Sequence, residues 1–125
     1  MNATADLLSA FGQALGLADF RWPADGLAAF AFDQRGILSL EVIDQTLLVY
    51  LSRDCDLRSD ARTPLTAALR LCHYRQRWPF TVQCALREES QLVFLIRLPL
   101  ATVTLPELEQ ALDLLTRLHE QVAAA

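Results

Sequence analysis

The sequence contains no lysine, so arginine supplies all 11 basic residues against 15 acidic ones. The resulting formal net charge of -4 repels phosphate backbones, and we expect no nucleic-acid binding. No apolar run approaches the roughly 18 residues that a membrane span requires. The first residues include Asp6 and no basic side chain, which is unlike a signal peptide. We therefore expect a cytoplasmic protein that does not insert into membranes.

Motifs that carry chemistry are also missing. There are only 4 glycines and no glycine-rich phosphate loop, and HExxH, CxxC and GxSxG do not occur. The three cysteines, Cys55, Cys72 and Cys84, are odd in number and their spacing fits no zinc pattern. We interpret them as buried free thiols in a reducing compartment. The sequence predicts no catalytic residue, no metal site and no cofactor, and hence a protein that is not an enzyme.

The two histidines, His73 and His119, both lie in predicted helices. Cys72 and His73 are adjacent, so on a helix they point about 100° apart and do not form a nucleophile–base pair. His119 falls in the last turns of the C-terminal helix, where the helix dipole favours a charged imidazole. An enzyme that uses Cys72 or Cys84 as a nucleophile remains an alternative, and it requires a lowered thiol pKa.

What the sequence has in excess is apolar side chains. They make up 53% of 125 residues, and the mean hydropathy is +0.23. A chain of this length forms one domain, here residues 1–125, and buries a core without disulfides or metals. Small domains have much surface per unit volume, so this composition suggests apolar surface reserved for a partner.

Hydrophobic periodicity predicts the order α-β-β-β-α-β-β-α. An amphipathic first helix ends at Gly16 and presents one face, made of Leu7, Leu8, Phe11, Ala14 and Leu15. Strands follow at 27–32, 36–43 and 46–52, joined by turns too short for parallel pairing. The second helix begins near Thr63-Pro64, ends at Trp78-Pro79, and has an apolar face of Leu65, Ala68, Leu69 and Cys72.

Two further strands are predicted at 80–86 and 91–98. The second of them is apolar on both faces, which indicates that both faces are covered, one of them by another subunit. The last helix opens with the capping box Thr104-Leu105-Pro106-Glu107. Its predicted buried side comprises Leu108, Ala111, Leu112, Leu115, Leu118 and Val122. The pattern is that of an α+β fold with three helices packed on an antiparallel sheet.

The C-terminal half, WPFTVQCALREESQLVFLIRLPLATVTLPELEQALDLLTRLHEQV, resembles the type III secretion chaperones of the Tir-chaperone (CesT) family. Glu89-Ser90-Gln91-Leu92-Val93, Leu105-Pro106 and the leucine-rich ending are most similar to the SycN-like branch. The resemblance implies a bacterial, dimeric α+β chaperone without catalytic activity or cofactor. Such a protein binds the N-terminal segment of a secreted effector or gatekeeper protein, and it forms a homodimer or a heterodimer with a second small chaperone.

The resemblance also implies two surfaces. The middle helix and nearby strands form the subunit interface, here Leu65, Ala68, Leu69, Cys72, Trp78, Val93 and Leu95. The first helix and the first three strands bind the partner, here Leu7, Phe11, Leu15, Phe20, Trp22, Phe30 and Phe32. For Leu7, Phe11, Phe30 and Phe32 a place in the core is an equal expectation. The remaining alternative is a small dimeric α+β regulator or adaptor that binds a folded partner.

Overall fold

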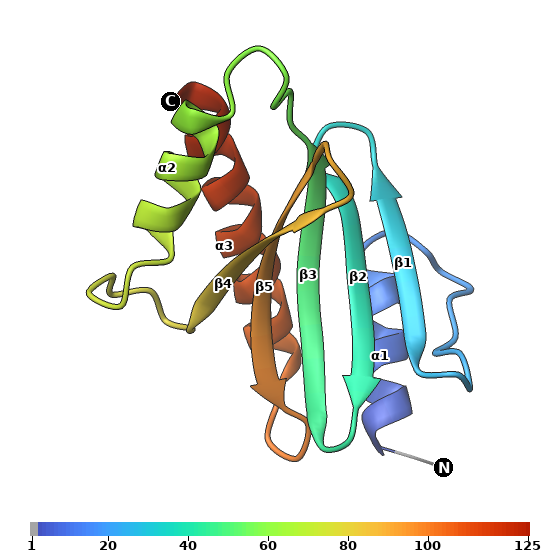
Figure 1. Ribbon diagram of the computed structural model, residues 1–125. Helices are drawn as coiled ribbons and strands as arrows, with labels where there is room; N and C mark the ends of the chain where they lie inside the picture. The colour runs from blue at the N-terminus through green and yellow to red at the C-terminus, as the bar shows by residue number, and fades with distance from the viewer. Residues whose placement is uncertain (1–2) are drawn as a thin grey trace.

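The computed structural model describes residues 3–125 and contains three helices and five strands in the predicted order (Figure 1). The helices are α1 (Ala3–Ala14), α2 (Arg62–Leu71) and α3 (Leu105–Ala124). The strands are β1 (Leu27–Phe32), β2 (Gly36–Ile43), β3 (Thr46–Asp54), β4 (Val82–Arg87) and β5 (Gln91–Pro99). The predicted α+β class is therefore confirmed.

The strands form one sheet in the order β1-β2-β3-β5-β4, and every neighbouring pair is antiparallel. The insertion of β5 between β3 and β4 leaves β1 and β4 as the two edges. Asp44 lies in the tight β2–β3 turn and Glu88 in the β4–β5 turn, both with positive φ (55° and 58°). Acidic side chains tolerate this left-handed conformation poorly compared with glycine, but a tight hairpin requires it.

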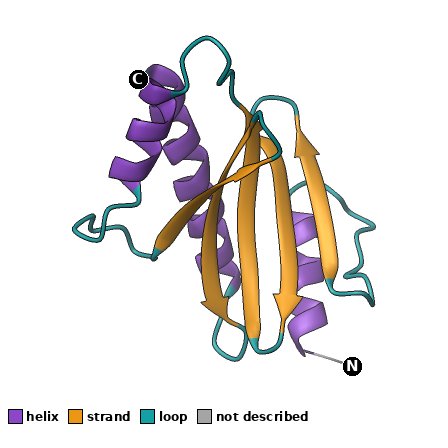
Figure 2. Ribbon diagram, viewed as in Figure 1, coloured by secondary structure: helices purple, strands orange, loops and turns teal. Residues whose placement is uncertain are grey.

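One face of the sheet carries the core. A row across the strands joins Leu38, Leu51 and Phe94, and all three side chains are buried. In Figure 2, α1 and α3 lie behind the sheet and α2 lies to its left, so the sheet face turned toward the viewer carries no helix. Alternation along each strand thus separates a covered face from an uncovered one.

Helix α3 is central to the packing. It contacts α1, α2, β3 and β5, so it is buried around much of its circumference. The predicted buried side is confirmed at all six of its positions, and Leu114, Thr116 and His119 are buried as well. Among residues 3–125, no helix is both long enough and apolar enough to cross a membrane.

The end of α2 and the start of β4 differ from the prediction. Helix α2 ends at Leu71, well before Trp78-Pro79, because side chains replace the donors of the next helical turn. The indole Nε1–H of Trp78 donates to the Leu71 carbonyl at 2.7 Å, and Gln76 Nε2 donates to the Arg70 carbonyl at 3.0 Å. The following strand consequently begins at Val82 and not at Phe80.

Helix α1 also differs in one respect. Ala14, expected on the apolar face, is exposed, whereas Gly12 is buried. The helix ends near Gly16, whose φ of 103° confirms the predicted left-handed stop.

Candidate partner and subunit surfaces

The segment after α1 folds back onto that helix and forms a groove with it. The backbone N–H of Trp22 donates to Ser9 Oγ at 2.9 Å, and Gln13 Nε2 donates to the Phe20 carbonyl at 3.1 Å. The resulting hollow of about 530 Å³ is lined by Ala5, Asp6, Ser9, Ala10, Gln13, Arg21 and Trp22. Trp22, at the edge of this hollow, is half-buried, so part of its indole is available to a partner.

Phe20 anchors this segment. Its ring stands 5.0 Å from the ring of Phe30, tilted by 54°. It also lies directly over Gly12, where a Cβ atom would collide with the ring. The missing side chain at position 12 therefore makes room for the aromatic contact that holds the loop.

The remaining predicted partner-binding residues separate into two groups. Phe11 has 0% of its surface exposed and Phe30 has 5%, so these two side chains belong to the core. Leu7, Leu15 and Phe32 are half-buried and pack against the core while keeping some surface. The Arg35 guanidinium lies 5.8 Å from the centre of the Phe32 ring, beside a second hollow of about 570 Å³.

Strand β1 adds a backbone surface to this region. It pairs only with β2, so within the described chain its other edge has no strand partner. Its outward side chains are Leu27, Ala29 and Ala31, all exposed. An apolar edge strand of this kind invites pairing with another chain unless something covers it.

Helix α2 presents the most exposed leucine of the proposed subunit interface. Leu69 is 66% exposed, although its neighbour Ala68 is in the core. Leu65, Cys72 and Trp78 are half-buried, and the helix packs against α3. One side of the helix thus covers the core, and on the other side Leu69 is exposed to water.

Val93 and Leu95 do not share that surface. Their register with Ser52 and Tyr50 places them on the uncovered sheet face, whereas α2 packs on the helical side. Val93 is buried within the sheet and Leu95 is half-buried. An interface that includes both the α2 side chains and the pair Val93 and Leu95 has to extend around the β4 edge of the sheet.

Several exposed apolar residues were not predicted as site residues. Tyr74 is 82% exposed in the α2–β4 loop, and Leu86 is 49% exposed on β4. Leu27, Ile37 and Ile43 are exposed on the uncovered face, and Leu17 is exposed in the loop after α1. Their strand and loop positions look like ordinary core pattern in the sequence. Only the lack of a covering element distinguishes them.

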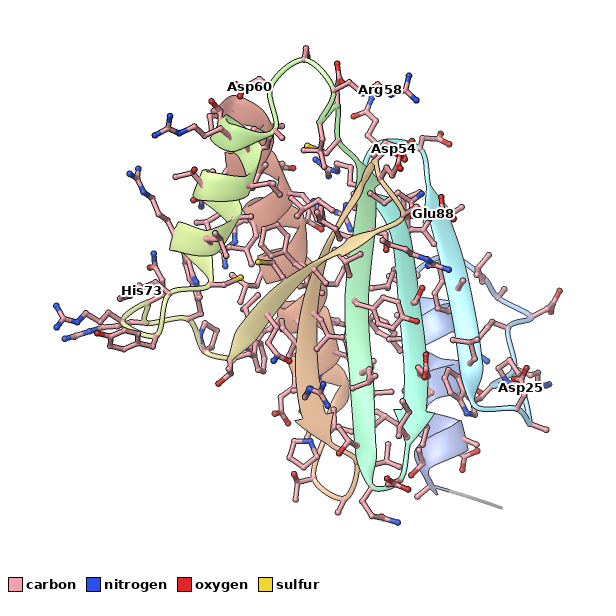
Figure 3. All side chains as sticks on the ribbon, viewed as in Figure 1. Asp25, Asp54, Arg58, Asp60, His73 and Glu88 are labelled. Carbon is pink, nitrogen blue, oxygen red and sulfur yellow. The ribbon has the colours of Figure 1, made fainter. Side chains whose placement is uncertain are left out.

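The projecting loop between α2 and β4 is basic and aromatic. Figure 3 shows His73 on this loop, away from the body of the molecule. The His73 and Tyr74 rings lie 4.2 Å apart, and the Arg75 guanidinium is 5.7 Å from the Tyr74 ring. Arginines and an exposed aromatic side chain thus gather in this loop, which follows soon after Leu69 in the sequence.

Strand β3 extends two residues beyond its predicted end and includes Arg53 and Asp54, so the charged loop begins at Cys55. It lies at the end of the sheet where Figure 3 labels Asp54, Arg58 and Glu88. Asp56 accepts hydrogen bonds from the Arg58 N–H and from Ser59 Oγ, which order the loop internally. In the part of the chain that the structure describes, no group of three or more His, Cys, Asp or Glu side chains could hold a metal ion.

Among residues 3–125, His119 is the one histidine that is buried in the core, and the prediction of a charged imidazole there is wrong. It is 2% exposed, and its Nε2–H donates to the Leu51 carbonyl at 2.7 Å. Its ring meets the edge of Phe94 with 4.9 Å between centres. Burial lowers the pKa of His119 to about 4, so the imidazole is neutral.

The cysteines are free thiols. Burial raises the pKa of Cys72 to about 12, with the adjacent Cys84 thiol contributing. Burial also raises the pKa of Cys55, together with the nearby Asp56 carboxylate. These directions oppose thiol activation.

Comparison with known proteins places the chain in context. A family model described as the type III secretory system chaperone SycN matches residues 5–123. Among curated proteins, no sequence matches significantly.

Solved structures of the same fold include the Yersinia pestis type III secretion chaperone SycH with a fragment of YscM2, at 18% identity and a TM-score of 0.66. That match covers 98% of each chain. The ExsC–ExsE complex matches at 21% identity and a TM-score of 0.71, over 94% of this chain and 90% of the other. YbjN of E. coli, assigned provisionally as a transcription regulator, matches at 16% identity and 0.52, over 94% and 86%.

Proposed function

Because the chain belongs to the SycN family of type III secretory system chaperones, we propose that it binds the N-terminal segment of a secreted effector or gatekeeper protein. Binding keeps that segment soluble and competent for export. The observation that carries the proposal is the family match over residues 5–123, nearly the whole chain. The complexes of SycH with a YscM2 fragment and of ExsC with ExsE, which share the fold, support it.

The exposed apolar surface supplies the physical mechanism. An unfolded segment loses conformational entropy when it is held, so the chaperone has to offer a large contact area. The groove beside Trp22, the half-buried Leu7 and Leu15, and the open edge of β1 offer such an area along one side of the sheet. A bound segment in extended conformation adds a strand to β1 and places apolar side chains in the groove.

The acidic surface complements this mechanism. A net charge of -4 favours solubility of a domain with exposed apolar side chains, because it opposes nonspecific aggregation. We further propose that the chain acts in the bacterial cytoplasm as one domain over residues 1–125, within the Tir-chaperone (CesT) family. It has no catalytic role and uses no cofactor, so release of the bound segment depends on other machinery.

We propose that the functional unit is a dimer that buries the outer side of α2. Leu69, Tyr74 and Leu86 are the exposed apolar side chains of α2, the following loop and β4. A stable interface buries about 800 Å² on each partner, which is more than these three side chains provide. The half-buried Leu65 and Trp78 therefore belong to the proposed interface as well. A second copy forms a homodimer through the same patch twice, and a second small chaperone forms a heterodimer.

The direct experiment is recovery of the tagged chain from its native cells, with bound proteins identified by mass spectrometry. Recovery of one secreted protein, bound through a short N-terminal segment, supports the chaperone function. A second small acidic protein of similar size indicates a heterodimer. Recovery of only folded cytosolic proteins, or of nothing in secretion-competent cells, overturns the proposal and favours the regulator or adaptor.

Substitution of Trp22 tests the groove. We expect Trp22→Ala to weaken binding of the recovered segment about 30-fold, which corresponds to roughly 2 kcal/mol for an aromatic hot spot. Trp22→Phe, which keeps an aromatic ring in the groove, should retain most of the affinity. Titration calorimetry measures both, after thermal unfolding has shown that the variants are folded. Equal affinity for wild type and Trp22→Ala would remove the groove from the binding surface.

A further inference from the structure

The arginines of this chain are not distributed evenly. Five of the 11 arginines fall between positions 61 and 87, a stretch that contains no aspartate or glutamate. The other six arginines share the rest of the chain with all 15 acidic residues. The stretch covers α2, the loop after it and β4, which lie together at one edge of the sheet (Figure 1). One side of an acidic protein is therefore basic.

The loop between α2 and β4 concentrates part of this charge around a hollow. The hollow has a volume of about 390 Å³ and is lined by Arg70, His73, Arg75 and Gln76. All four side chains are exposed, and each carries a hydrogen-bond donor. A hollow that is lined by donors, two of them guanidinium groups, fits an anion.

Hydrogen bonds within the loop hold it in this shape. The Arg70 carbonyl accepts from the His73 N–H at 3.2 Å and from Gln76 Nε2 at 3.0 Å. The Arg75 N–H donates to His73 Nδ1 at 3.1 Å. Because Nδ1 accepts this bond, the proton of the neutral imidazole lies on Nε2, which can donate it to an anion. The loop is thus ordered before a ligand arrives, which reduces the entropy lost on binding.

Apolar side chains accompany the charges. Tyr74 is 82% exposed, and its ring lies 4.2 Å from the centre of the His73 ring and 5.7 Å from the Arg75 guanidinium. Leu69, one residue before Arg70, is 66% exposed. A free anion gains nothing from such side chains, whereas a protein segment that carries carboxylates buries them. Tyrosine and arginine are also prominent among the residues that contribute most to protein interfaces.

We propose that this loop is a docking site for an acidic segment of a partner protein, whose aspartate or glutamate carboxylates pair with Arg70 and Arg75. A guanidinium binds a carboxylate through two parallel hydrogen bonds, and Tyr74 packs against the apolar side chains of the segment. Nucleic acid also presents anions, but the acidic remainder of the chain repels its dense charge.

The site is independent of the surfaces proposed above. The loop leads into β4, at the opposite edge of the sheet from β1 and its open edge. The four residues that line the hollow are not among those of the proposed dimer interface. The failure of the chaperone or dimer proposal therefore leaves this one standing, and the reverse also holds.

Titration with a defined acidic peptide tests the proposal. The folded, isotope-labelled chain is titrated with a blocked hexaglutamate peptide at low ionic strength and followed by NMR. We expect saturable shifts of the backbone amides of residues 70–76, and no comparable shifts with hexaglutamine. Arg70→Gln and Arg75→Gln should each weaken binding about fivefold, the upper end for an exposed ion pair. Both arginines are exposed, so the variants should fold, which their spectra verify.

Arg117→Gln is the matched control. Arg117 is an exposed arginine of α3 with Asp113 and Glu120 one turn away on either side, and its loss changes the net charge equally. It should leave the affinity nearly unchanged. Equal weakening by Arg117→Gln, or no shifts at residues 70–76, overturns the proposal. So does tighter binding of inorganic phosphate or oligothymidylate to the same residues, because the loop then selects phosphate and not an acidic protein segment.

Discussion

His119 illustrates how one side chain can make the stability depend on pH. In an unfolded chain its pKa is about 6.5, whereas burial lowers the folded pKa to about 4. The unfolded state therefore binds a proton first as the pH falls. The contribution of His119 is complete above pH 6.5 and is lost as the pH falls from 6.5 through 4.

We expect the free energy of unfolding to fall by up to about 1.4 kcal/mol per pH unit in this window through His119 alone. His119→Gln removes this titration, so the difference between wild type and variant should shrink as the pH falls from 7 to 4. Urea unfolding at several pH values measures it. His73→Gln, at an exposed histidine, is the matched control. A difference that does not change with pH would contradict the neutral, buried imidazole.

Gly12 is a second position where one atom decides the local packing. In a helix interior, Gly→Ala ordinarily stabilises by about 1 kcal/mol. Here the added Cβ meets the Phe20 ring, so we expect Gly12→Ala to destabilise by about 1–3 kcal/mol and to loosen the loop from α1. Urea unfolding of Gly12→Ala in the wild-type and Phe20→Ala backgrounds separates the two effects. Stabilisation in both backgrounds would rule out the steric contact.

At the scale of elements, α3 shows how much of a helix can be predicted from local sequence. Its start is specified by residues close together in the chain. Thr104 N–H donates to Glu107 Oε1 at 3.1 Å, and Glu107 N–H donates to Thr104 Oγ1 at 3.4 Å. This capping box was predicted and is present, because its partners are three residues apart and need no tertiary contact.

We expect Thr104→Ala to lower the free energy of unfolding by about 1 kcal/mol, because a helix N–H loses its acceptor. Thr104→Ser should retain most of the stability. Thr102→Ala, an exposed threonine outside the cap, serves as the control and is expected to have no comparable effect. Chemical unfolding measures all three. Equal losses for Thr104→Ala and Thr102→Ala would show that the cap contributes nothing.

Helix α2 is the contrasting element. Its end was predicted at the next proline, but it lies at Leu71, where the Trp78 indole donates to the last free carbonyl. The contact joins residues seven apart through a loop whose path depends on the packing of Trp78 against the core. No local pattern contains that information, so the sequence analysis placed the boundary incorrectly.

At the scale of the whole molecule, the exposed leucine of α2 leads to a prediction about assembly. We expect Leu69→Ser to shift a dimer toward folded monomer, with at least a tenfold weaker dimerisation constant, because a 66% exposed apolar side chain suits a subunit contact. Sedimentation velocity over a concentration series measures this shift. Leu17→Ser is the matched control, since Leu17 is also exposed but lies in the loop after α1.

The control also makes the prediction decisive. If Leu69→Ser and wild type dimerise equally, α2 does not form the interface. If wild type is monomeric alone but forms a 1:1 complex with a second small chaperone, the same substitution should weaken that complex instead. A change caused equally by Leu17→Ser would point to nonspecific association of exposed apolar side chains.

The sequence by itself determined the order of elements, the antiparallel sheet, the bounds of β1 and β2, and the inner side of α3. These follow from periodicity, short turns and capping, which act between residues near each other in the chain. Tertiary structure alone decided that Phe11 and Phe30 belong to the core while Leu69 and Tyr74 face water. It also decided that His119 is neutral. Burial depends on which distant elements cover a residue, and no local pattern records that.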